Sequence, residues 1–235
     1  MFHGQEGAGK TTLASRFPKP LFFALERGIP ADIVVDGVQD IDSFGATMDS
    51  LRHIYTEGPG DYQTLAIDTI DMLEAHLVEH VCTKHGWDNI EKPSYGKGWV
   101  ACDDEWRRFI RAITAIRDKH GMTIVLTAHT TIERIEDPRA PAFTRYAPRL
   151  HKRARALVSD ACDIIGFLAE DLRIITDEGG FHERTRAAAA DGRYLFVEGK
   201  PSFAAKNRFA MPPKIAIPLN LDFGTLSQHW LKEKS

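Results

Sequence analysis

The sequence predicts an α/β fold in which a mainly parallel sheet is flanked by helices and carries a C-terminal antiparallel extension. Strand-length apolar runs alternate with helical patterns through most of the chain. These runs are almost continuously apolar, which is typical of parallel strands that are buried on both faces. Near the C-terminus, shorter strand patterns are joined by turns that contain glycine or proline. We therefore expect one domain over residues 1–235, with its core at about 1–170 and the extension at about 171–235.

The expected core strands are short apolar runs, several of which end in a polar residue. They are Met1–His3, Pro20–Leu25, Tyr62–Thr69, Met122–Ala128 and Ala161–Leu168. The residues expected in the shorter strands of the extension are Leu172–Ile175, Arg193–Val197 and Lys214–Ile217. A central parallel strand usually has about five or six residues. Only three precede Gly4, so the first strand looks truncated and we expect natural sequence upstream of Met1.

Helical spacing of apolar residues separates several of these strands. The residues that show it are Ile70, Leu73, Leu77 and Val81 in one segment, and Trp106, Phe109, Ile110, Ile113 and Ile116 in another. A shorter helix is expected at Thr12–Phe17, where Pro18 stops it.

Composition is typical of a protein without a membrane-spanning segment, but it does not indicate what the protein binds. The net charge is −3 and no long block of like charge occurs, so bulk charge neither suggests nor excludes nucleic acid. No apolar run approaches the length of a membrane span, and the N-terminus lacks a signal pattern, so no membrane partner is expected. The three cysteines form no CxxC pair, which favours reduced thiols in a cytoplasmic protein.

The segment Gly4–Thr11 matches the phosphate-binding pattern G-x-x-x-x-G-K-[ST] in full. Its glycines let successive backbone N–H groups turn toward a phosphate. Lys10 would supply charge to the outer phosphates, and the Thr11 hydroxyl is a hard ligand for Mg²⁺. We therefore expect ATP and Mg²⁺ to bind here. The residues predicted to contact the nucleotide are Gly4, Gln5, Glu6, Gly7, Ala8, Gly9, Lys10, Thr11 and Thr12.

Two carboxylates follow later strands and are candidates for the chemistry at the phosphates. Asp68 closes the third strand and is the expected magnesium carboxylate, although it could instead cap the helix that follows. Glu26 stands at the tip of the second strand, where it could orient a water for attack on the γ-phosphate. The alternative for Glu26 is an ordinary solvated loop glutamate.

Three further residues are predicted to act in catalysis. His129 ends the fourth strand and could sense the γ-phosphate, or could simply cap the strand. Lys206 and Arg208 could reach the γ-phosphate of a neighbouring subunit and stabilise the charge of phosphoryl transfer. A solvated turn is the plainer interpretation of that pair.

A competing metal motif occurs in the predicted helix after Asp68. The run His76-Leu77-Val78-Glu79-His80 fits H-x-x-E-H, a zinc signature, and Cys82 and His85 lie close by. The apolar stripe of the same helix makes a solvated face the simpler reading of His76 and His80, so zinc is not favoured.

Taken in order, these motifs resemble the RecA-like P-loop NTPase core. Phe23-Ala24-Leu25-Glu26 is similar to the end of the second strand in replicative hexameric helicases, where the glutamate is the catalytic base. Lys206-Asn207-Arg208-Phe209 is similar to an element of RadA-type recombination ATPases that contacts nucleotide between subunits. The chain as a whole is most similar to phage-encoded RecA-like ATPases of the single-strand annealing and recombination group. That resemblance implies an ATPase that self-associates into a ring or filament in the host cytoplasm, together with single-stranded DNA and possibly a single-strand-binding protein.

The resemblance also covers a basic segment after the fourth strand, for which we expect DNA contacts. Its cations could neutralise phosphates while its tyrosine stacks on a base. The predicted DNA-binding residues are Arg145, Tyr146, Arg149, Lys152 and Arg153. A solvated basic helix start is the alternative.

Three functions remain open from the sequence. The first is a DNA-stimulated ATP hydrolase in recombination, annealing or repair. The second is a small-molecule kinase, with the stretch from Arg134 to Arg155 serving as a lid. The third is a nucleotide-gated binding protein with little turnover.

Overall fold

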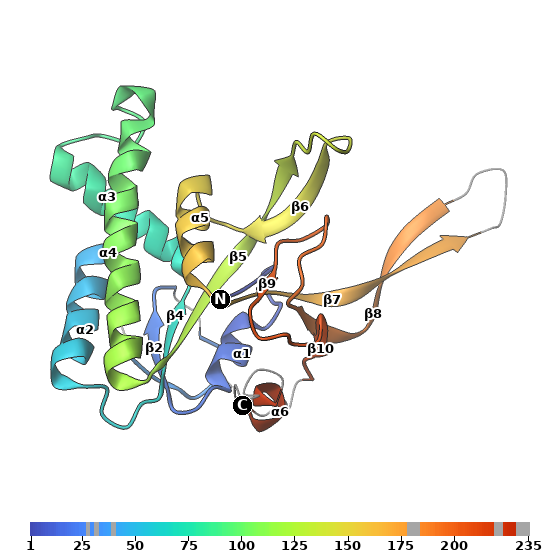
Figure 1. The fold of residues 1–235 in the computed structure, drawn as a ribbon, viewed down its shortest axis with the longest axis horizontal. Coiled ribbons are helices and arrows are strands. Elements are labelled where there is room, and N and C mark those ends of the chain that lie inside the picture. The colour runs from blue at the N-terminus through green and yellow to red at the C-terminus, as the bar shows by residue number, and fades with distance from the viewer. Residues whose placement is uncertain (27–28, 31–32, 39–40, 178–183, 219–222, 229–235) are drawn as a thin grey trace.

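The computed structural model describes residues 1–26, 29–30, 33–38, 41–177, 184–218 and 223–228 (Figure 1). The strands are β1 (Phe2–Gly4), β2 (Pro20–Ala24), β3 (Asp36–Val38), β4 (Thr64–Asp68), β5 (Thr123–Ile135), β6 (Phe143–Pro148), β7 (Ile164–Asp177), β8 (Arg184–Phe196), β9 (Lys206–Asn207) and β10 (Lys214–Ala216). The helices are α1 (Lys10–Ser15), α2 (Phe44–Glu57), α3 (Ile70–His85), the short η1 (Ser94–Gly96), α4 (Lys97–His120), α5 (Lys152–Ala161) and α6 (Phe223–Ser227). None of the helices described is both long and apolar enough to cross a membrane.

The sheet has a parallel centre and an antiparallel edge, as the sequence predicts. The strand order is β10-β8-β7-β1-β5-β4-β2-β3, with β6 paired to β5 and β9 to β7. Every pair from β7 through β1, β5, β4 and β2 to β3 is parallel, whereas β8 pairs antiparallel with both β7 and β10. The antiparallel ribbon of β7 and β8 projects from the rest of the molecule (Figure 1).

Apolar cores lie on both faces of the parallel sheet, because successive side chains of a strand point to opposite faces. In β4, Leu65 and Ile67 join the core formed with helices α2 to α5, whereas Ala66 joins the core on the α1 face. The predicted apolar positions of α3 and α4 are buried in the first of these cores, except Ile110, which is partly buried against it. Helices therefore cover both faces of the parallel sheet, as predicted.

Several elements differ from the prediction. Leu172–Ile175 is not a separate short strand but part of β7, which runs across the expected boundary between core and extension. The run Ala161–Leu168 is not one strand, because α5 ends at Ala161 and β7 begins only at Ile164. Strand β5 does not stop at His129 but continues as an antiparallel hairpin with β6. The pattern also gave no hint of α2, although Ser43 caps it by accepting a hydrogen bond from the Ala46 N–H.

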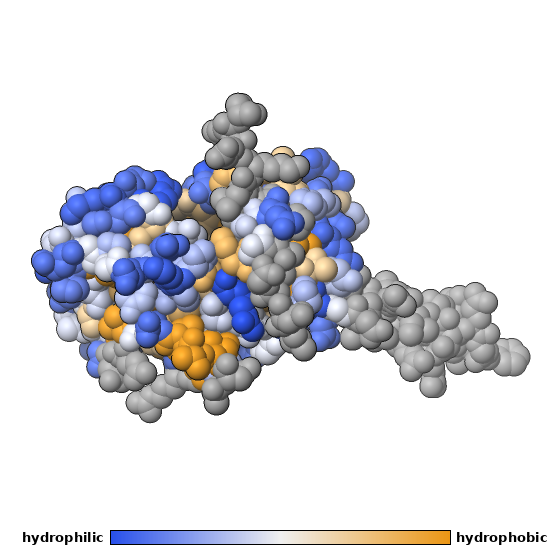
Figure 2. Space-filling model, turned by 90° about the horizontal axis from the view of Figure 1, so that it is seen from below, coloured by the Kyte–Doolittle hydropathy of each residue, from blue (hydrophilic) through white to orange (hydrophobic). Residues whose placement is uncertain are grey.

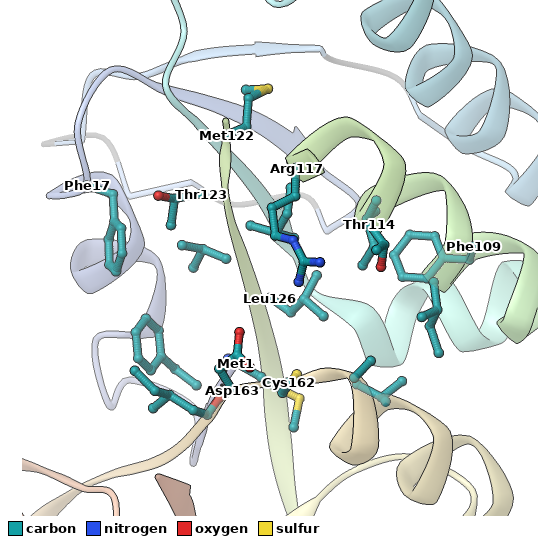
Figure 3. A pocket seen from close by; sticks show the side chains of 18 of the residues that line it. Met1, Phe17, Phe109, Thr114, Arg117, Met122, Thr123, Leu126, Cys162 and Asp163 are labelled. Carbon is teal, nitrogen blue, oxygen red and sulfur yellow. Dashed lines mark hydrogen bonds between the residues drawn. The ribbon is translucent and has the colours of Figure 1, made fainter. Parts of the chain in front are cut away.

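An open apolar cavity of about 380 Å³ lies at the amino-terminal edge of the parallel sheet. Strand β1 pairs with β5 only from Thr127 onward, and among the strands described none pairs with Thr123–Val125 on that side. Phe17 and Phe109, which line the cavity, lie on opposite sides of β5 (Figure 3). A view from below shows an apolar patch on an otherwise largely hydrophilic face (Figure 2). This edge therefore offers apolar contact and few groups for chemistry.

Candidate nucleotide site

Several buried polar groups gather at the opposite, carboxyl-terminal edge of the parallel strands. The segment Gly4–Thr11 leaves β1 there and enters α1, while Asp68 ends β4 and His129 lies where the parallel part of β5 finishes. Glu26 follows β2 at the same edge. Ligands of open parallel sheets bind at this edge, so the topology brings together residues that are far apart in the sequence.

The phosphate-binding segment has the backbone geometry that its glycines allow. Gly7 and Gly9 adopt φ angles of 73° and 89°, which side-chain-bearing residues rarely adopt. A Cβ on Gly4 would lie 2.4 Å from the Leu168 carbonyl oxygen, so the close approach of β7 also requires glycine. The loop is therefore shaped by backbone, as an anion-binding nest requires.

Lys10 lies within this loop. Its side chain donates to the carbonyl oxygens of Gly4 at 3.1 Å and Gln5 at 3.0 Å, and the residue is only 6% exposed. Burial lowers the pKa of the Lys10 ammonium, while the charge of Asp68 opposes that shift. A phosphate in the loop could replace both carbonyl contacts with stronger charge-assisted ones.

Thr11 and Asp68, the predicted metal ligands, contact each other. The Thr11 hydroxyl donates to Asp68 Oδ2 at 2.7 Å, and the Thr127 hydroxyl donates to the other carboxylate oxygen. Hydroxyl and carboxylate oxygens are hard donors of the kind that Mg²⁺ prefers. The pair thus fits a magnesium ion, with Thr127 fixing the orientation of the carboxylate.

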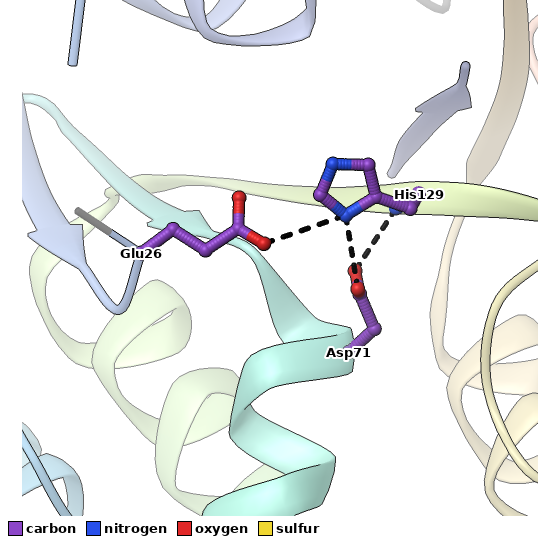
Figure 4. A group of neighbouring side chains, drawn as sticks. All are labelled: Glu26, Asp71 and His129. Atoms are coloured by element: carbon purple, nitrogen blue, oxygen red, sulfur yellow. Dashed lines mark hydrogen bonds and ion pairs between the residues drawn. The ribbon is translucent and has the colours of Figure 1, made fainter. Parts of the chain in front are cut away.

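Glu26, Asp71 and His129 form a cluster beside this pair (Figure 4). The Nδ1 atom of His129 lies 3.0 Å from Asp71 Oδ2 and 3.5 Å from Glu26 Oε1. The backbone N–H of His129 also donates to Asp71 Oδ1 at 2.9 Å, which fixes the imidazole relative to α3. Glu26 remains about one third exposed, so one carboxylate faces open space while the other is buried.

Arg149 completes the cluster. Its Nη2 donates to Asp71 Oδ2 at 2.6 Å and lies 3.1 Å from His129 Nδ1. Burial alone would raise the pKa of Asp71, but hydrogen bonds from His129 and Arg149 hold that pKa below its usual value. Burial raises the pKa of Glu26, and the charges of His129 and Arg149 oppose the shift. Because Arg149 already supplies a positive charge to the buried carboxylate, the cluster does not need a cation to be neutralised.

The other four residues predicted to bind DNA lie outside this cluster. Arg145 pairs with Glu133 across the β5–β6 hairpin, and Arg153 pairs with Asp103 of α4. Tyr146 stacks against Phe167 with the ring centroids 5.3 Å apart. Lys152 is exposed at the start of α5. The five predicted DNA residues thus follow one another along the chain from β6 to α5, but Arg145 and Tyr146 are consecutive in β6 and point to opposite faces of the hairpin.

Lys206 and Arg208 lie away from the phosphate-binding segment of their own chain. Lys206 donates to the Ser159 carbonyl oxygen at 2.6 Å, and Arg208 pairs with Asp163 at 2.9 Å. Both contacts are made near the amino-terminal start of β7. The structure thus separates this pair from Lys10 along the strand direction, and Arg208 remains 53% exposed.

The alternative zinc motif is not assembled. His76 and His80 do lie on α3, but His80 approaches Glu105, which is already paired with Lys84. Over the described part of the chain, the one group of three possible metal ligands is Glu26, Asp71 and His129.

The sequence did not predict that Asp71 and Thr127 belong to the site. It predicted Arg149 as a DNA-binding residue and not as part of this cluster. Asp71 stands three residues after Asp68 in the first helical turn, a spacing that could have placed it at the same edge. Thr127 lies two residues before His129 and so points to the same face of β5. Arg149 had no local signal, because its position depends on the turn of the chain back from the β6 strand.

Comparison with known proteins supports the assignment of the loop. Residues 1–209 match the protein family described as "AAA domain". The chain is also 26% identical over 217 residues to the SPbeta prophage-derived uncharacterized protein YorG of Bacillus subtilis (strain 168). The alignment covers 87% of this chain but only 62% of that relative, so the chain spans less than two thirds of the relative's length.

Proposed function

The chain belongs to the AAA-domain family of P-loop proteins, and from that premise we propose that it is a magnesium-dependent ATP hydrolase that acts on single-stranded DNA. The observation that carries the proposal is the grouping of Glu26, His129 and Arg149 beside the loop that holds Lys10. A phosphate-binding loop alone would suit a binding protein. A carboxylate with a raised pKa at the same edge adds a group that can take a proton from water.

Each residue has a distinct part in this proposal. Lys10 and the backbone of Gly4–Thr11 bind the β- and γ-phosphates, while Thr11 and Asp68 hold Mg²⁺, which neutralises phosphate charge. Glu26 orients the attacking water and accepts its proton, since it is the exposed carboxylate of the cluster. Asp71 is buried and hydrogen-bonded, so it positions His129 and Arg149 rather than acting on water.

The DNA part of the proposal rests on the continuity of the segment from Arg145 to Arg153. Arg149 lies midway along this segment, and its N–H donates to the His129 carbonyl oxygen at 2.8 Å. Arg145 and Arg153 are ion-paired but keep 36% and 44% of their side chains exposed, so phosphates can still reach them. Single-stranded DNA bound along this segment would shift Arg149, which contacts both Asp71 and His129. DNA would thereby stimulate hydrolysis without touching the nucleotide.

Self-association into a ring or filament is part of the same proposal. Lys206 and Arg208 lie away from the loop of their own chain, but Arg208 is 53% exposed although it is paired with Asp163, so a neighbouring subunit could compete for its guanidinium. An arginine supplied by a second subunit is an established way to stabilise the charge of phosphoryl transfer.

Steady-state ATP hydrolysis with and without single-stranded DNA tests the proposal. We expect Mg²⁺-dependent hydrolysis that DNA stimulates, and the stimulation should fall steeply with added salt because phosphate contacts release counterions. Lys152→Ala should reduce the stimulation and leave the DNA-independent rate unchanged, whereas Lys200→Ala, an exposed lysine outside the segment, should change neither. Hydrolysis that no single strand alters would refute the DNA role, and ATP binding without turnover would refute the hydrolase.

A further inference from the structure

An arginine of the antiparallel extension lies against the phosphate-binding loop. The guanidinium of Arg193, on β8, is so close to Gly9 that a Cβ built there would lie 2.1 Å from Arg193 Nη1. Within the described residues, the Arg193 side chain forms neither a hydrogen bond nor an ion pair. The predicted motifs do not include Arg193, and the proposed hydrolysis mechanism leaves it unused.

Arg193 closes a narrow slot along one face of α1. The slot is lined by Gly9, Thr12, Leu13, Arg16, Arg193, Ile217 and Pro218. The first four share one side of the helix, since they follow its i, i+3, i+4, i+7 spacing. The free space is only about 10 Å³, and the guanidinium of Arg193 occupies the side of the slot next to Gly9. The obstruction is the end of a flexible side chain rather than backbone, so it can move aside.

The direction of the triphosphate indicates what the slot would hold. Thr11 faces Asp68 at 2.7 Å, with Glu26 and His129 at the same edge, so the γ-phosphate belongs on that side of the loop. Two residues along a helix correspond to a rotation of about 200°, so Leu13, which lines the slot, faces away from Thr11. The α-phosphate and the nucleoside must therefore leave the loop toward the slot.

The lining of the slot suits a nucleoside better than another phosphate. Leu13, Ile217 and Pro218 offer apolar contact, and two arginines, Arg16 and Arg193, can lie against the face of an aromatic ring. We propose that Arg193 binds the nucleoside end of the nucleotide by stacking its guanidinium on the base, with the apolar residues of the slot on the other side. This inference rests on the proposed nucleotide site. It makes the antiparallel extension part of that site rather than an appendage.

Binding of ADP and of inorganic pyrophosphate, each with Mg²⁺, separates this role from simple charge attraction. Neither ligand is a substrate for ATP hydrolysis, so titration calorimetry can follow both at equilibrium. Arg193→Ala should weaken ADP binding about tenfold, as loss of a desolvated cation–π contact predicts. Pyrophosphate lacks the nucleoside, so its affinity should stay within about threefold of wild type. Arg193→Lys keeps the charge but loses the planar group, so it should also lose most of the ADP affinity.

Lys200→Ala provides the matched control, because it removes one exposed positive charge elsewhere in the extension and should change neither affinity. Unchanged ADP binding in Arg193→Ala would overturn the inference, as would an equal loss for ADP and pyrophosphate. Failure of the wild-type protein to bind either ligand would instead refute the proposed nucleotide site. Thermal unfolding of each variant confirms that it is folded when it is titrated.

Discussion

The two edges of the parallel sheet differ sharply in chemistry although the same strands form both. At the carboxyl-terminal edge, Lys10, Asp68, Asp71 and His129 are all buried and all hydrogen-bonded. At the amino-terminal edge, the same sheet ends in an open cavity lined mostly by apolar side chains. Burying a polar group costs free energy unless it finds a partner. The partnered polar cluster distinguishes the carboxyl-terminal edge, where we propose that nucleotide binds, from the apolar edge.

The two edges also differ in the surroundings of their arginines. Arg149 at the carboxyl-terminal edge is tied to Asp71 and His129, so its loss would leave a buried carboxylate without its positive partner. Arg117 at the other edge lines the cavity and pairs with its exposed neighbour Asp118. Charge at one edge should thus matter for nucleotide chemistry, and charge at the other should not.

The largest expected effect is on nucleotide binding at the carboxyl-terminal edge. Lys10→Ala removes the charge that faces the phosphates, so ATP affinity should fall on the order of 100-fold and turnover should drop to background. Arg117→Ala removes one positive charge at the amino-terminal edge and should bind ATP like the wild type. Titration calorimetry and a phosphate-release assay measure both. A folded Lys10→Ala protein with near-normal activity would contradict the site assignment.

A buried histidine outside the site should affect stability rather than nucleotide binding. His3 of β1 is fully buried, with Nε2 2.7 Å from the Ala204 carbonyl oxygen and Nδ1 3.0 Å from the Thr130 hydroxyl. Burial lowers the pKa of His3 from 6.5 to about 4. Between those values the unfolded chain binds more protons than the folded one. The free energy of unfolding should therefore fall by about 3 kcal/mol as the pH drops from 6.5 to 4.

Chemical denaturation of wild type and His3→Gln across this pH range isolates that contribution. Glu74 titrates in the same range with the opposite sign, since burial raises its pKa to about 7. It is present in both proteins and cancels in the difference. The difference in unfolding free energy should shrink as the pH falls toward 4. A difference that does not depend on pH would show that His3 is not held neutral by burial.

The smallest expected signal comes from a mixture of two inactive proteins. If Arg208 acts on the nucleotide of a neighbouring subunit, a Glu26→Gln subunit can lend its intact Arg208 to an Arg208→Ala subunit. Random assembly of an equal mixture rebuilds roughly a quarter of the sites, so about that share of wild-type ATPase activity should return. No recovery despite proven co-assembly would place Arg208 within its own chain, where it pairs with Asp163.

The sequence was informative about the fold wherever periodicity and length agreed. The strands β2 and β4 were predicted with nearly correct bounds. The apolar spacing also indicated α3 and α4, but α4 begins at Lys97, well before the first predicted position, Trp106. The β5–β6 hairpin was missed because Glu133, Arg134 and Arg145 made its strands look like a solvated basic segment. Cross-strand pairing of Arg145 with Glu133 offsets this polarity, and a local pattern cannot show such a pair.

For the candidate site, motif spacing identified residues whose role follows from a local sequence pattern. It did not identify residues that reach the site only through long-range contacts. Gly4–Thr11 and Asp68 follow from local chemistry, and the contact of Thr11 with Asp68 fits that reading. Arg149 was assigned to DNA because only its basic neighbours were visible in the sequence. Its ion pair with Asp71 links residues 78 positions apart, which only the tertiary structure reveals.

Comparison of Glu26→Gln with wild type tests most directly the claim that Glu26 activates the attacking water. The substitution changes one atom of the carboxylate, so it can affect hydrolysis without affecting ATP binding. The amide keeps the shape of the side chain but cannot accept a proton from water. Steady-state turnover should therefore fall about 100-fold or more, while ATP affinity measured by calorimetry stays within about threefold of wild type. Wild-type turnover in Glu26→Gln would contradict the account and place the catalytic base elsewhere.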